Sequence, residues 1–268
     1  MYKLVVSDID GTLLPYGQER LDPAVFDVLR RLRARGVLFC LASGRQFHSL
    51  RRLFQPVEDD VLWMCENGAI LYGNGPEDQA PILHRTPIPR ADALALCREI
   101  IALPGCQVLI SGANVSYLYD CTPEYAEYMQ TAKGNRTVIC QRPEDIQEEI
   151  LKVSAYCPQG TLPYEQELRP RWADRLTVAV AGPDWLDFTA ANKGIGLAAL
   201  CRILGIPPEE TLAFGDNWND AEMLDQAGLA FLMRGSAPAL LARYPNHCAS
   251  VTAVLEANME TWFPPNSP

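Results

Sequence analysis

The stretch VVSDIDGTLL, at residues 5–14, places two aspartates directly after an apolar run. Side chains two positions apart on a strand point to the same side, so Asp8 and Asp10 can converge on one site. Gly11 follows at once, and its lack of a side chain lets the backbone come close to a neighbouring group. An Asp-Gly turn capped by the aspartate side chains would explain the same letters. The rest of the sequence is needed to distinguish a capped turn from a functional site at Asp8 and Asp10.

The first third of the chain alternates between strand-like and helix-like segments. Strands are expected over 3–9, 37–42 and 61–65, which are short and apolar. Helices are expected over 23–35, where apolar residues recur at helical spacing after a capping aspartate, and over 43–54. This order predicts an α/β fold with a parallel sheet and helices on both of its faces.

The alternation breaks after the third expected strand. Residues 73–81 are rich in glycine, proline and acidic residues and are expected to form a linker. Residues 82–187 mix short strands with helices, one of them expected near 143–153, and are predicted to form an inserted α+β domain. The strand–helix alternation then returns, so the expected core domain consists of residues 1–81 and 188–268.

Composition and charge limit the classes of function that the protein can have. The 268 residues carry a formal net charge of −10, and an acidic surface repels phosphate backbones, which argues against nucleic-acid binding. The nine cysteines are scattered without a CxxC pair, which predicts neither a disulfide framework nor a zinc site and favours a cytoplasmic location. The sequence has neither a signal-peptide pattern nor an apolar run of about 18 residues, so no membrane association is expected.

A second acidic motif, AFGDNWND, occupies residues 213–220. An apolar strand again runs into a glycine and an aspartate, Asp216, while Asn219 and Asp220 follow in the first turn of the next expected helix. Clustered oxygen ligands without a neighbouring histidine or cysteine suit a hard cation such as Mg²⁺. The alternative is that Asp216 or Asn217 only caps the helix.

Two further positions suit a bound phosphate. In LASGR, residues 41–45, Ser43 offers a hydroxyl and Gly44 a backbone amide at an expected helix N-terminus. Lys193 offers a cation, although a surface lysine needs no such explanation. A carboxylate can attack phosphorus to form an aspartyl-phosphate, while Mg²⁺ and a lysine neutralise the phosphoryl oxygens.

With these residues in this order, the chain resembles the haloacid dehalogenase (HAD) superfamily of phosphatases. The resemblance is to the Cof-type group, in which a large α/β cap of type IIB lies between the second and third motifs. It implies a Rossmann-like core and a cap that selects the substrate. The matches are the DxDGT motif at 8–12, the second-motif serine Ser43, the third-motif lysine Lys193 and the GDxxND motif at 215–220.

The resemblance also implies roles for individual residues. Asp8 would be the nucleophile, and Asp10 the general acid and base. Asp8, Asp216 and the backbone carbonyl of Asp10 would bind Mg²⁺, with Asp220 supporting the metal from outside its ligand shell. The residues implied to bind phosphate are Ile9, Ser43, Gly44, Lys193 and Asn219.

The expected function is therefore Mg²⁺-dependent hydrolysis of small phosphate monoesters, with sugar phosphates favoured. The partner would be a small phosphorylated metabolite, and the oligomeric state stays open. A phosphomutase or phosphotransferase would use the same residues, with a second hydroxyl in place of water. A phospho-aspartate signalling module and a non-catalytic binding protein are weaker alternatives, because the paired Asp8 and Asp10 suit a complete catalytic cycle.

Overall fold

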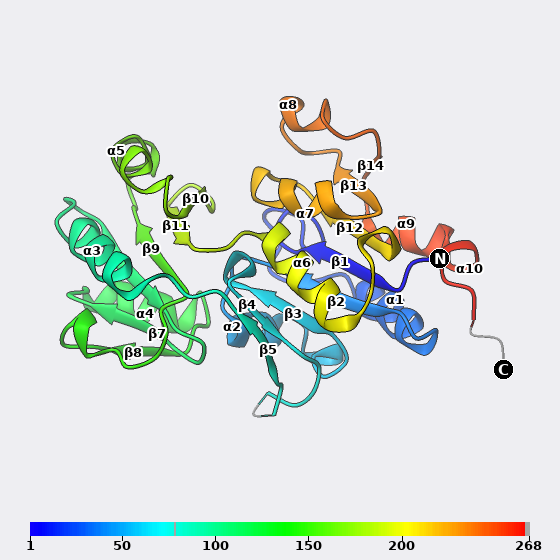
Figure 1. Ribbon diagram of the computed structural model, residues 1–268, viewed down its shortest axis with the longest axis horizontal. Helices are drawn as coiled ribbons and strands as arrows, with labels where there is room; N and C mark the ends of the chain where they lie inside the picture. Colours follow the sequence, from blue (N-terminus) through cyan, green and yellow to red (C-terminus); the bar gives the residue numbers. More distant parts are fainter. Residues whose placement is uncertain (78, 266–268) are drawn as a thin grey trace.

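The computed structural model describes residues 1–77 and 79–265, and its larger sheet has eight strands (Figure 1). These are β1 (Leu4–Asp8), β2 (Leu38–Ala42), β3 (Leu62–Cys65), β4 (Ile70–Tyr72), β5 (Ile82–Arg85), β12 (Thr211–Gly215), β13 (Leu229–Met233) and β14 (His247–Cys248). Their order is β14-β13-β12-β1-β2-β3-β4-β5. The pairs from β14 to β3 are parallel, and β4 and β5 are added as an antiparallel hairpin.

Helices cover both faces of this sheet, as expected. Val5 of β1 packs in one core with α1, α2, α9 and α10, whereas Leu4 and Val6 face a second core with α6, α7 and α8. The helices are α1 (Pro23–Ala34), α2 (Phe47–Leu53), α6 (Lys193–Leu204), α7 (Ala221–Gln226), α8 (Pro238–Leu241), α9 (Val251–Ala257) and α10 (Met259–Trp262). The strands between these layers are therefore buried on both sides, which is why they are apolar throughout.

Helix α1 shows why the first expected helix forms. The carboxylate of Asp22 accepts a hydrogen bond from the backbone amide of Ala24 at 2.9 Å, and Pro23 occupies the first helical position. Val25 and Leu29 lie on the buried face of the helix. The sequence prediction of a helix from residue 23 with a capping aspartate is confirmed.

The second domain has a six-stranded sheet in the order β10-β11-β9-β6-β7-β8. Its neighbours are antiparallel except for the parallel pair β7 and β8. Helices α3 and α5 pack on one face, and α4 packs on the other. The elements are α3 (Arg90–Ile101), β6 (Gln107–Ser111), β7 (Ser116–Tyr119), α4 (Pro123–Thr131), β8 (Thr137–Ile139), β9 (Lys152–Tyr156), α5 (Leu162–Trp172), β10 (Thr177–Val180) and β11 (Trp185–Thr189).

The expected domain boundaries need correction at both ends. Residues 82–85 form β5, which pairs with β4 in the core sheet, so the second domain begins after Arg85. The expected linker, 73–81, lies between β4 and β5, and its described residues, 73–77 and 79–81, belong to the loop of that hairpin. Gly73 donates a backbone hydrogen bond to Pro81 at 2.8 Å. At the other end, strand β11 of the second domain continues to Thr189, beyond the expected boundary at residue 187. The inserted domain therefore spans about residues 86–189.

The helix expected near 143–153 is wrong. Residues Pro143–Asp145 make one 3₁₀ turn, and Lys152 begins β9. Strand β9 lies between β6 and β11 in the middle of its sheet, so its residues are buried on both faces. The strand has only five residues, KVSAY, and so short a stretch cannot be distinguished from the end of a helix by its periodicity.

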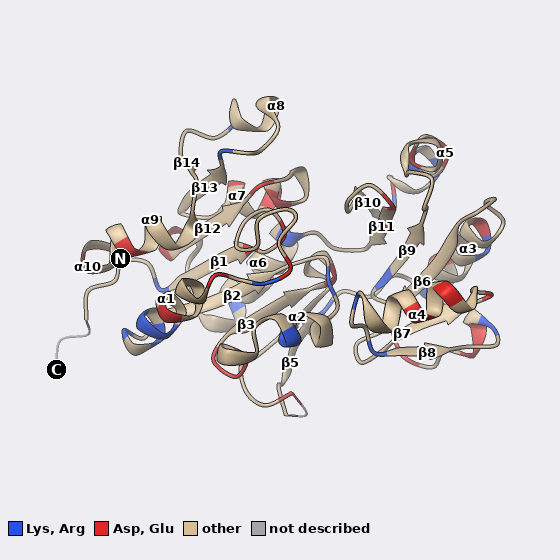
Figure 2. Cartoon of the chain, turned by 180° about the vertical axis from the view of Figure 1, so that it is seen from behind, with Lys and Arg blue, Asp and Glu red and all other residues tan. Residues whose placement is uncertain are grey.

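Charged residues of both signs occur in both domains, as Figure 2 shows from behind. Most of the strands carry no charged residue in that view, as expected for elements buried in a sheet. Within residues 1–77 and 79–265, none of the helices has the length and apolarity needed to cross a membrane.

Candidate active site

The two acidic motifs meet at one point of the core sheet. Strand β1 lies between β2 and β12. The strands that follow β1 in sequence are added on the β2 side, and the strands of the C-terminal part are added on the β12 side, so the strand order reverses at β1. Ligands of open α/β sheets bind beyond the carboxyl ends of the strands at such a reversal. Asp8 is the last residue of β1, and Asp216 directly follows β12. The fold thus brings together carboxylates that are more than 200 residues apart in sequence.

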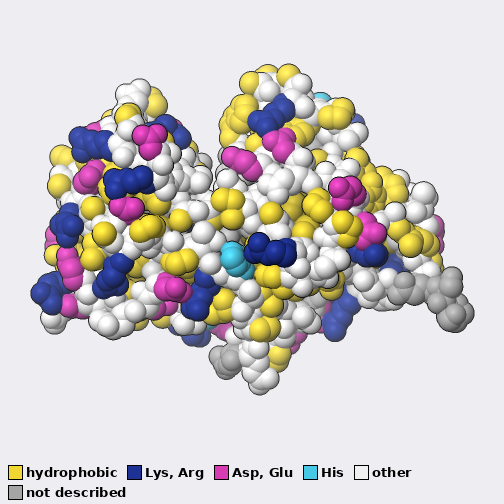
Figure 3. All heavy atoms as spheres, viewed as in Figure 1, with side chains coloured by type: hydrophobic (Ala, Val, Ile, Leu, Met, Phe, Trp, Pro, Cys, Tyr) yellow, Lys and Arg dark blue, Asp and Glu magenta, His cyan; other side chains and the backbone are white. Residues whose placement is uncertain are grey.

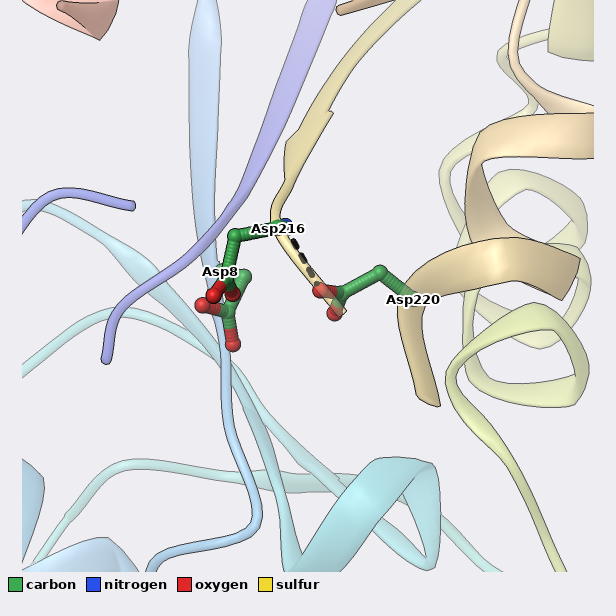
Figure 4. A group of neighbouring side chains, drawn as sticks. All are labelled: Asp8, Asp216 and Asp220. Atoms are coloured by element: carbon green, nitrogen blue, oxygen red, sulfur yellow. Dashed lines mark hydrogen bonds between the residues drawn. The ribbon is translucent and has the colours of Figure 1, made fainter. Parts of the chain in front are cut away.

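Three aspartates form a cluster there, drawn in Figure 4. Asp8, Asp216 and Asp220 each offer one carboxylate oxygen, and these three atoms lie within 4.8 Å of one another. All three residues are buried. Among the described residues, the buried Oδ2 atom of Asp8 has no hydrogen-bond partner. A free oxygen in an oxygen-only donor set fits a hard divalent cation such as Mg²⁺.

Lys193 lies behind this cluster and is completely buried. Its Nζ atom is 2.5 Å from Asp8 Oδ1 and 2.5 Å from Asp220 Oδ1. Burial alone would lower the pKa of Lys193, but the carboxylates of Asp220 and Asp8 raise that pKa on balance. Burial and the charge of Asp220 raise the pKa of Asp8. One ammonium therefore faces more than one carboxylate, and a bound divalent cation would neutralise the excess negative charge.

Asp220 shapes the loop that carries Asp216. Its Oδ2 atom accepts backbone hydrogen bonds from Asp216 at 3.0 Å and from Asn217 at 3.1 Å; the first is dashed in Figure 4. The helix expected from residue 217 begins as a 3₁₀ turn, Trp218–Asp220, before α7. Because both oxygens of Asp220 already have partners in the protein, its geometry suits support of the site rather than direct metal binding.

Asp10 lies nearer to solvent than Asp8, and its carboxylate faces a cation that the sequence analysis did not select. Arg45 Nε donates to Asp10 Oδ2 at 2.9 Å, and Arg45 Nη2 donates to Asp10 Oδ1 at 2.5 Å. Such a bidentate pair fixes the orientation of the carboxylate. Arg45 directly follows Ser43 and Gly44, and this proximity was the only cue in the sequence.

The residues expected to bind phosphate do not all line the same cleft. Ser43, Gly44 and Asn219 line the same cleft as Asp8 and Asp10. Lys193 reaches Asp8 from behind, and the side chain of Ile9 is fully buried in the core, so only its backbone could face a ligand.

One local expectation around Ser43 is wrong. Helix α2 begins at Phe47 with Gln46 as its N-cap, so Ser43 and Gly44 do not open the helix. Instead, the Ser43 Oγ atom accepts a hydrogen bond from the backbone amide of Arg45 at 3.2 Å. This local bond closes a turn, and the turn delays the start of the helix.

Asp216 has two partners that the motifs did not reveal. Tyr16 donates from its hydroxyl to Asp216 Oδ2 at 2.7 Å, and Thr12 donates to Asp216 Oδ1 at 3.4 Å. Gly11 lies against both Asp216 and Tyr16 at a φ of 93°, and a Cβ atom there would lie 2.3 Å from Asp216 Oδ2. The predicted close approach at Gly11 therefore exists, and its neighbour is the second acidic motif.

The cleft above these residues has a volume of about 500 Å³ and lies between the two domains. Figure 3 shows the molecule hollowed where the domains meet. The inserted domain contributes Lys133, Asn135 and Trp185 to its wall. The Lys133 ammonium lies 5.7 Å from the centroid of the Trp185 ring, a cation–π distance. The inserted domain thus places a cation and an aromatic ring opposite Asp8.

Known proteins resemble this chain over most of its length. A family model described as haloacid dehalogenase-like hydrolase matches residues 5–253. The 5-amino-6-(5-phospho-D-ribitylamino)uracil phosphatase YbjI of Escherichia coli K12 is 26% identical over 251 residues, which are 90% of this chain and 88% of that protein. An HMP-PP phosphatase of Klebsiella pneumoniae is 26% identical over 250 residues, with coverage of 92% and 89%.

Solved structures share the fold as well. A structure from Eubacterium rectale has a TM-score of 0.82 at 27% identity and covers 96% of this chain and 98% of its own. The HAD subclass IIB sugar phosphatase BT4131 has a TM-score of 0.76 at 19% identity, with coverage of 95% and 98%. That likeness shows a common core and cap. Since the family model spans most of its residues, the chain belongs to the haloacid dehalogenase-like hydrolase family, as a Cof-type enzyme of its phosphatase group.

Proposed function

We propose that this enzyme is a Mg²⁺-dependent phosphatase that hydrolyses small phosphate monoesters through an aspartyl-phosphate. The observation that carries the proposal is the setting of Asp8, which lines the cleft with a buried lysine behind it and two further aspartates beside it. The phosphatases named above act on phosphorylated small molecules, which agrees with the size of the cleft.

The proposed reaction has two displacements at phosphorus. Asp8 attacks the phosphorus atom, the bond to the leaving oxygen breaks, and Asp10 gives that oxygen a proton. Asp10 then takes a proton from a water molecule, which attacks the aspartyl-phosphate, releases inorganic phosphate and restores the Asp8 carboxylate. In the structure Arg45 binds both oxygens of the ionised Asp10 carboxylate, so one of these two hydrogen bonds would open when Asp10 carries the proton and form again when the proton has left.

The proposal includes a metal site and a phosphate site beside Asp8. Asp8, Asp216 and the backbone carbonyl of Asp10 would hold Mg²⁺, with Asp220 fixing the loop of Asp216. The ion would neutralise charge on the phosphoryl oxygens. The groups proposed to bind the phosphate are the backbone at Ile9, the Ser43 hydroxyl, the Gly44 amide, the Lys193 ammonium and the Asn219 amide.

The inserted domain is proposed to act as a cap that selects the leaving group. Its contribution to the cleft includes the charged Lys133 and the carboxamide of Asn135, which can donate hydrogen bonds to hydroxyl or carbonyl oxygens. A sugar phosphate offers such oxygens at the distance of a few bonds from phosphorus, so sugar phosphates are the preferred class. Phosphorylated cofactors and nucleotides come next.

Removal of metal tests the proposed chemistry directly. After dialysis against EDTA, we expect phosphate release from a panel of phosphate monoesters to fall at least about 100-fold and to return when Mg²⁺ is added. Ca²⁺ should restore much less activity, because its longer bonds and variable coordination fit a tight site poorly. Full activity in the metal-free protein would contradict the proposal. Release of free phosphate in equal amount to the dephosphorylated product would separate hydrolysis from transfer to a second hydroxyl.

Lys133→Met tests the role of the cap. We expect kcat/KM for the best substrate of the panel to fall roughly tenfold, mainly through KM, because a charge-assisted hydrogen bond to the leaving group is lost. Acetyl phosphate, which is too small to reach the cap, should react at an unchanged rate. Arg142→Gln, on an exposed cap arginine outside the cleft, is the control. An equal loss on both substrates would instead place Lys133 at the phosphate.

A further inference from the structure

The turn after β3 has a conformation that the proposed chemistry does not explain. Glu66, Asn67 and Gly68 have φ values of 52°, 55° and 90°, so three successive residues lie in the left-handed region. Glycine adopts this region freely and asparagine tolerates it, whereas glutamate is rarely found there. Both Glu66 and Asn67 are nevertheless buried, with 2% and 4% of their surfaces exposed. Such a turn persists only where the surrounding structure holds it.

The side chain that holds Glu66 comes from the other domain. Lys152, the first residue of β9, places its Nζ atom 2.6 Å from Glu66 Oε2. The same ammonium donates a hydrogen bond to the backbone carbonyl of Gly44 at 2.7 Å. Lys152 is only 6% exposed. One buried cap lysine therefore binds the strained turn and the backbone of a proposed phosphate-binding residue at once.

Asp187 of β11 extends the contact to Asn67. Its Oδ2 atom accepts a hydrogen bond from Asn67 Nδ2 at 3.1 Å and lies 3.4 Å from the Lys152 ammonium. Its Oδ1 atom accepts a hydrogen bond from Ser154 at 2.7 Å. Both oxygens of this buried carboxylate are thereby satisfied, so its position is fixed within the cap sheet.

Asn67 connects this network to the phosphate pocket. Its Oδ1 atom accepts a hydrogen bond from Asn219 Nδ2 at 3.4 Å. The same oxygen would lie 3.0 Å from a Cβ atom at Gly44, so the two residues pack closely. A shift of Asn67 would therefore move or release both Gly44 and Asn219.

The network lies at the end of the cap sheet that leads back to the core. Lys152 is paired in register with Thr189, the last residue of β11, and the chain enters α6 at Lys193 soon afterwards. A rotation of the cap about this end would displace these residues less than the distant cleft wall around Lys133. The contacts between Lys152, Glu66 and Asp187 can then persist while the remainder of the cap moves.

We propose that Lys152 and Asp187 are positioning residues of the reaction: they hold the Glu66–Asn67 turn and thereby set Gly44 and Asn219 around the phosphate. The inference rests on the proposed phosphatase function and adds a second task to the cap. Through Lys152 and Asp187 the cap affects how the phosphoryl group of every substrate is bound. The part of the cleft wall around Lys133, in contrast, contacts only leaving groups that are large enough to reach it.

The test compares Lys152→Met with wild type on acetyl phosphate and on the best monoester of the panel. We expect kcat to fall about 10- to 100-fold on both substrates, as is usual when a residue that orients binding groups is removed. The ratio of kcat/KM between the two substrates should stay constant, and inhibition by inorganic phosphate should weaken. Lys3→Met removes an exposed lysine from a pair with Glu210 and serves as the matched control, with no expected change.

A second pair of variants separates positioning from folding. Lys152→Met leaves the Glu66 carboxylate buried without its partner, and the double variant Lys152→Met/Glu66→Gln removes that charge. We expect the double variant to regain thermal stability but not kcat. Asn67→Gly keeps the left-handed backbone without strain and removes the carboxamide, so it should lower kcat on both substrates in a stable protein.

Three outcomes would overturn the inference. One is a folded Lys152→Met variant with wild-type kcat on acetyl phosphate, and another is a loss confined to the larger substrate. The third is recovery of kcat together with stability in the double variant, which would assign Lys152 a purely structural role. A wild-type protein that releases no phosphate from any panel member would instead refute the proposed function. The two failures are therefore distinguishable, because the inference on Lys152 fails only where the wild-type protein is active.

Discussion

Replacement of Asp8 by asparagine is expected to lower kcat by roughly four or more orders of magnitude on every phosphate monoester that the wild-type enzyme hydrolyses. The amide cannot attack phosphorus, so no aspartyl-phosphate can form. Substrate binding should change far less, because Ser43, Gly44 and Asn219 still line the cleft. The measurement is phosphate release under single-turnover and steady-state conditions in Mg²⁺.

The same variant should remain folded. Burial and Asp220 raise the pKa of Asp8, so its ionised form is disfavoured in the folded protein, and this cost applies above the pKa of the unfolded chain. Asparagine has the same shape and removes the cost, so in the absence of metal the free energy of unfolding should stay constant or rise by about 1 kcal/mol. Asp27→Asn, on the exposed face of α1, is the matched control for charge removal. Residual activity above about 1% in Asp8→Asn would place the nucleophile elsewhere.

The sequence predicted the centre of the site because its chemistry is local in the chain. Asp8 ends one strand and Asp216 directly follows another, and the rule that such strand ends meet at one edge of the sheet needs no side-chain detail. The structure brings Asp8, Asp216, Asp220 and Lys193 into direct contact or close proximity, as the motifs led us to expect. Short motifs at the ends of buried strands therefore carried most of the information.

The remaining contacts depend on which distant residues the fold brings together. Tyr16 reaches Asp216 across 200 positions of sequence, and Asn67 reaches Asp187 across 120. The EN pair at residues 66–67 could be recognised only as a turn, because neither its left-handed backbone nor its burial leaves a signal beyond the following glycine. Lys152 had still less signal, since it begins a strand that was expected to be the end of a helix.

The errors in the fold have the same origin. The hairpin of β4 and β5 extends the core sheet, but the sequence between these strands has the composition of a linker, which predicts a domain boundary before β5. No helix was expected at α5, because the segment contains Pro170 and carries little of the apolar spacing that marks a helix. The helix forms because Leu168 and Trp172 pack into the cap core. For both the hairpin and helix α5, contacts with distant residues stabilise a structure that the local sequence pattern does not predict.

Replacement of Lys193 by methionine is expected to abolish activity and to destabilise the protein by about 3–5 kcal/mol. Its ammonium is completely buried and lies 2.5 Å from both Asp8 and Asp220, so methionine leaves two buried carboxylates without a cation. Chemical denaturation in the absence of metal measures the loss. Lys3→Met, on the surface, should change the free energy of unfolding by less than about 0.5 kcal/mol.

The double variant Lys193→Met/Asp8→Asn tests whether the unpaired charge of Asp8 causes the loss of stability in Lys193→Met. If unpaired carboxylates cause the destabilisation, removing the Asp8 charge should recover about 1–3 kcal/mol, since residues in direct contact couple by such amounts. Activity should stay absent, because the nucleophile and the cation are both gone. Equal destabilisation of the single and the double variant would mean that the packing of methionine, and not the charge of Asp8, is responsible. The cluster would then lack the electrostatic coupling through which Lys193 is proposed to act on Asp8 and the phosphate.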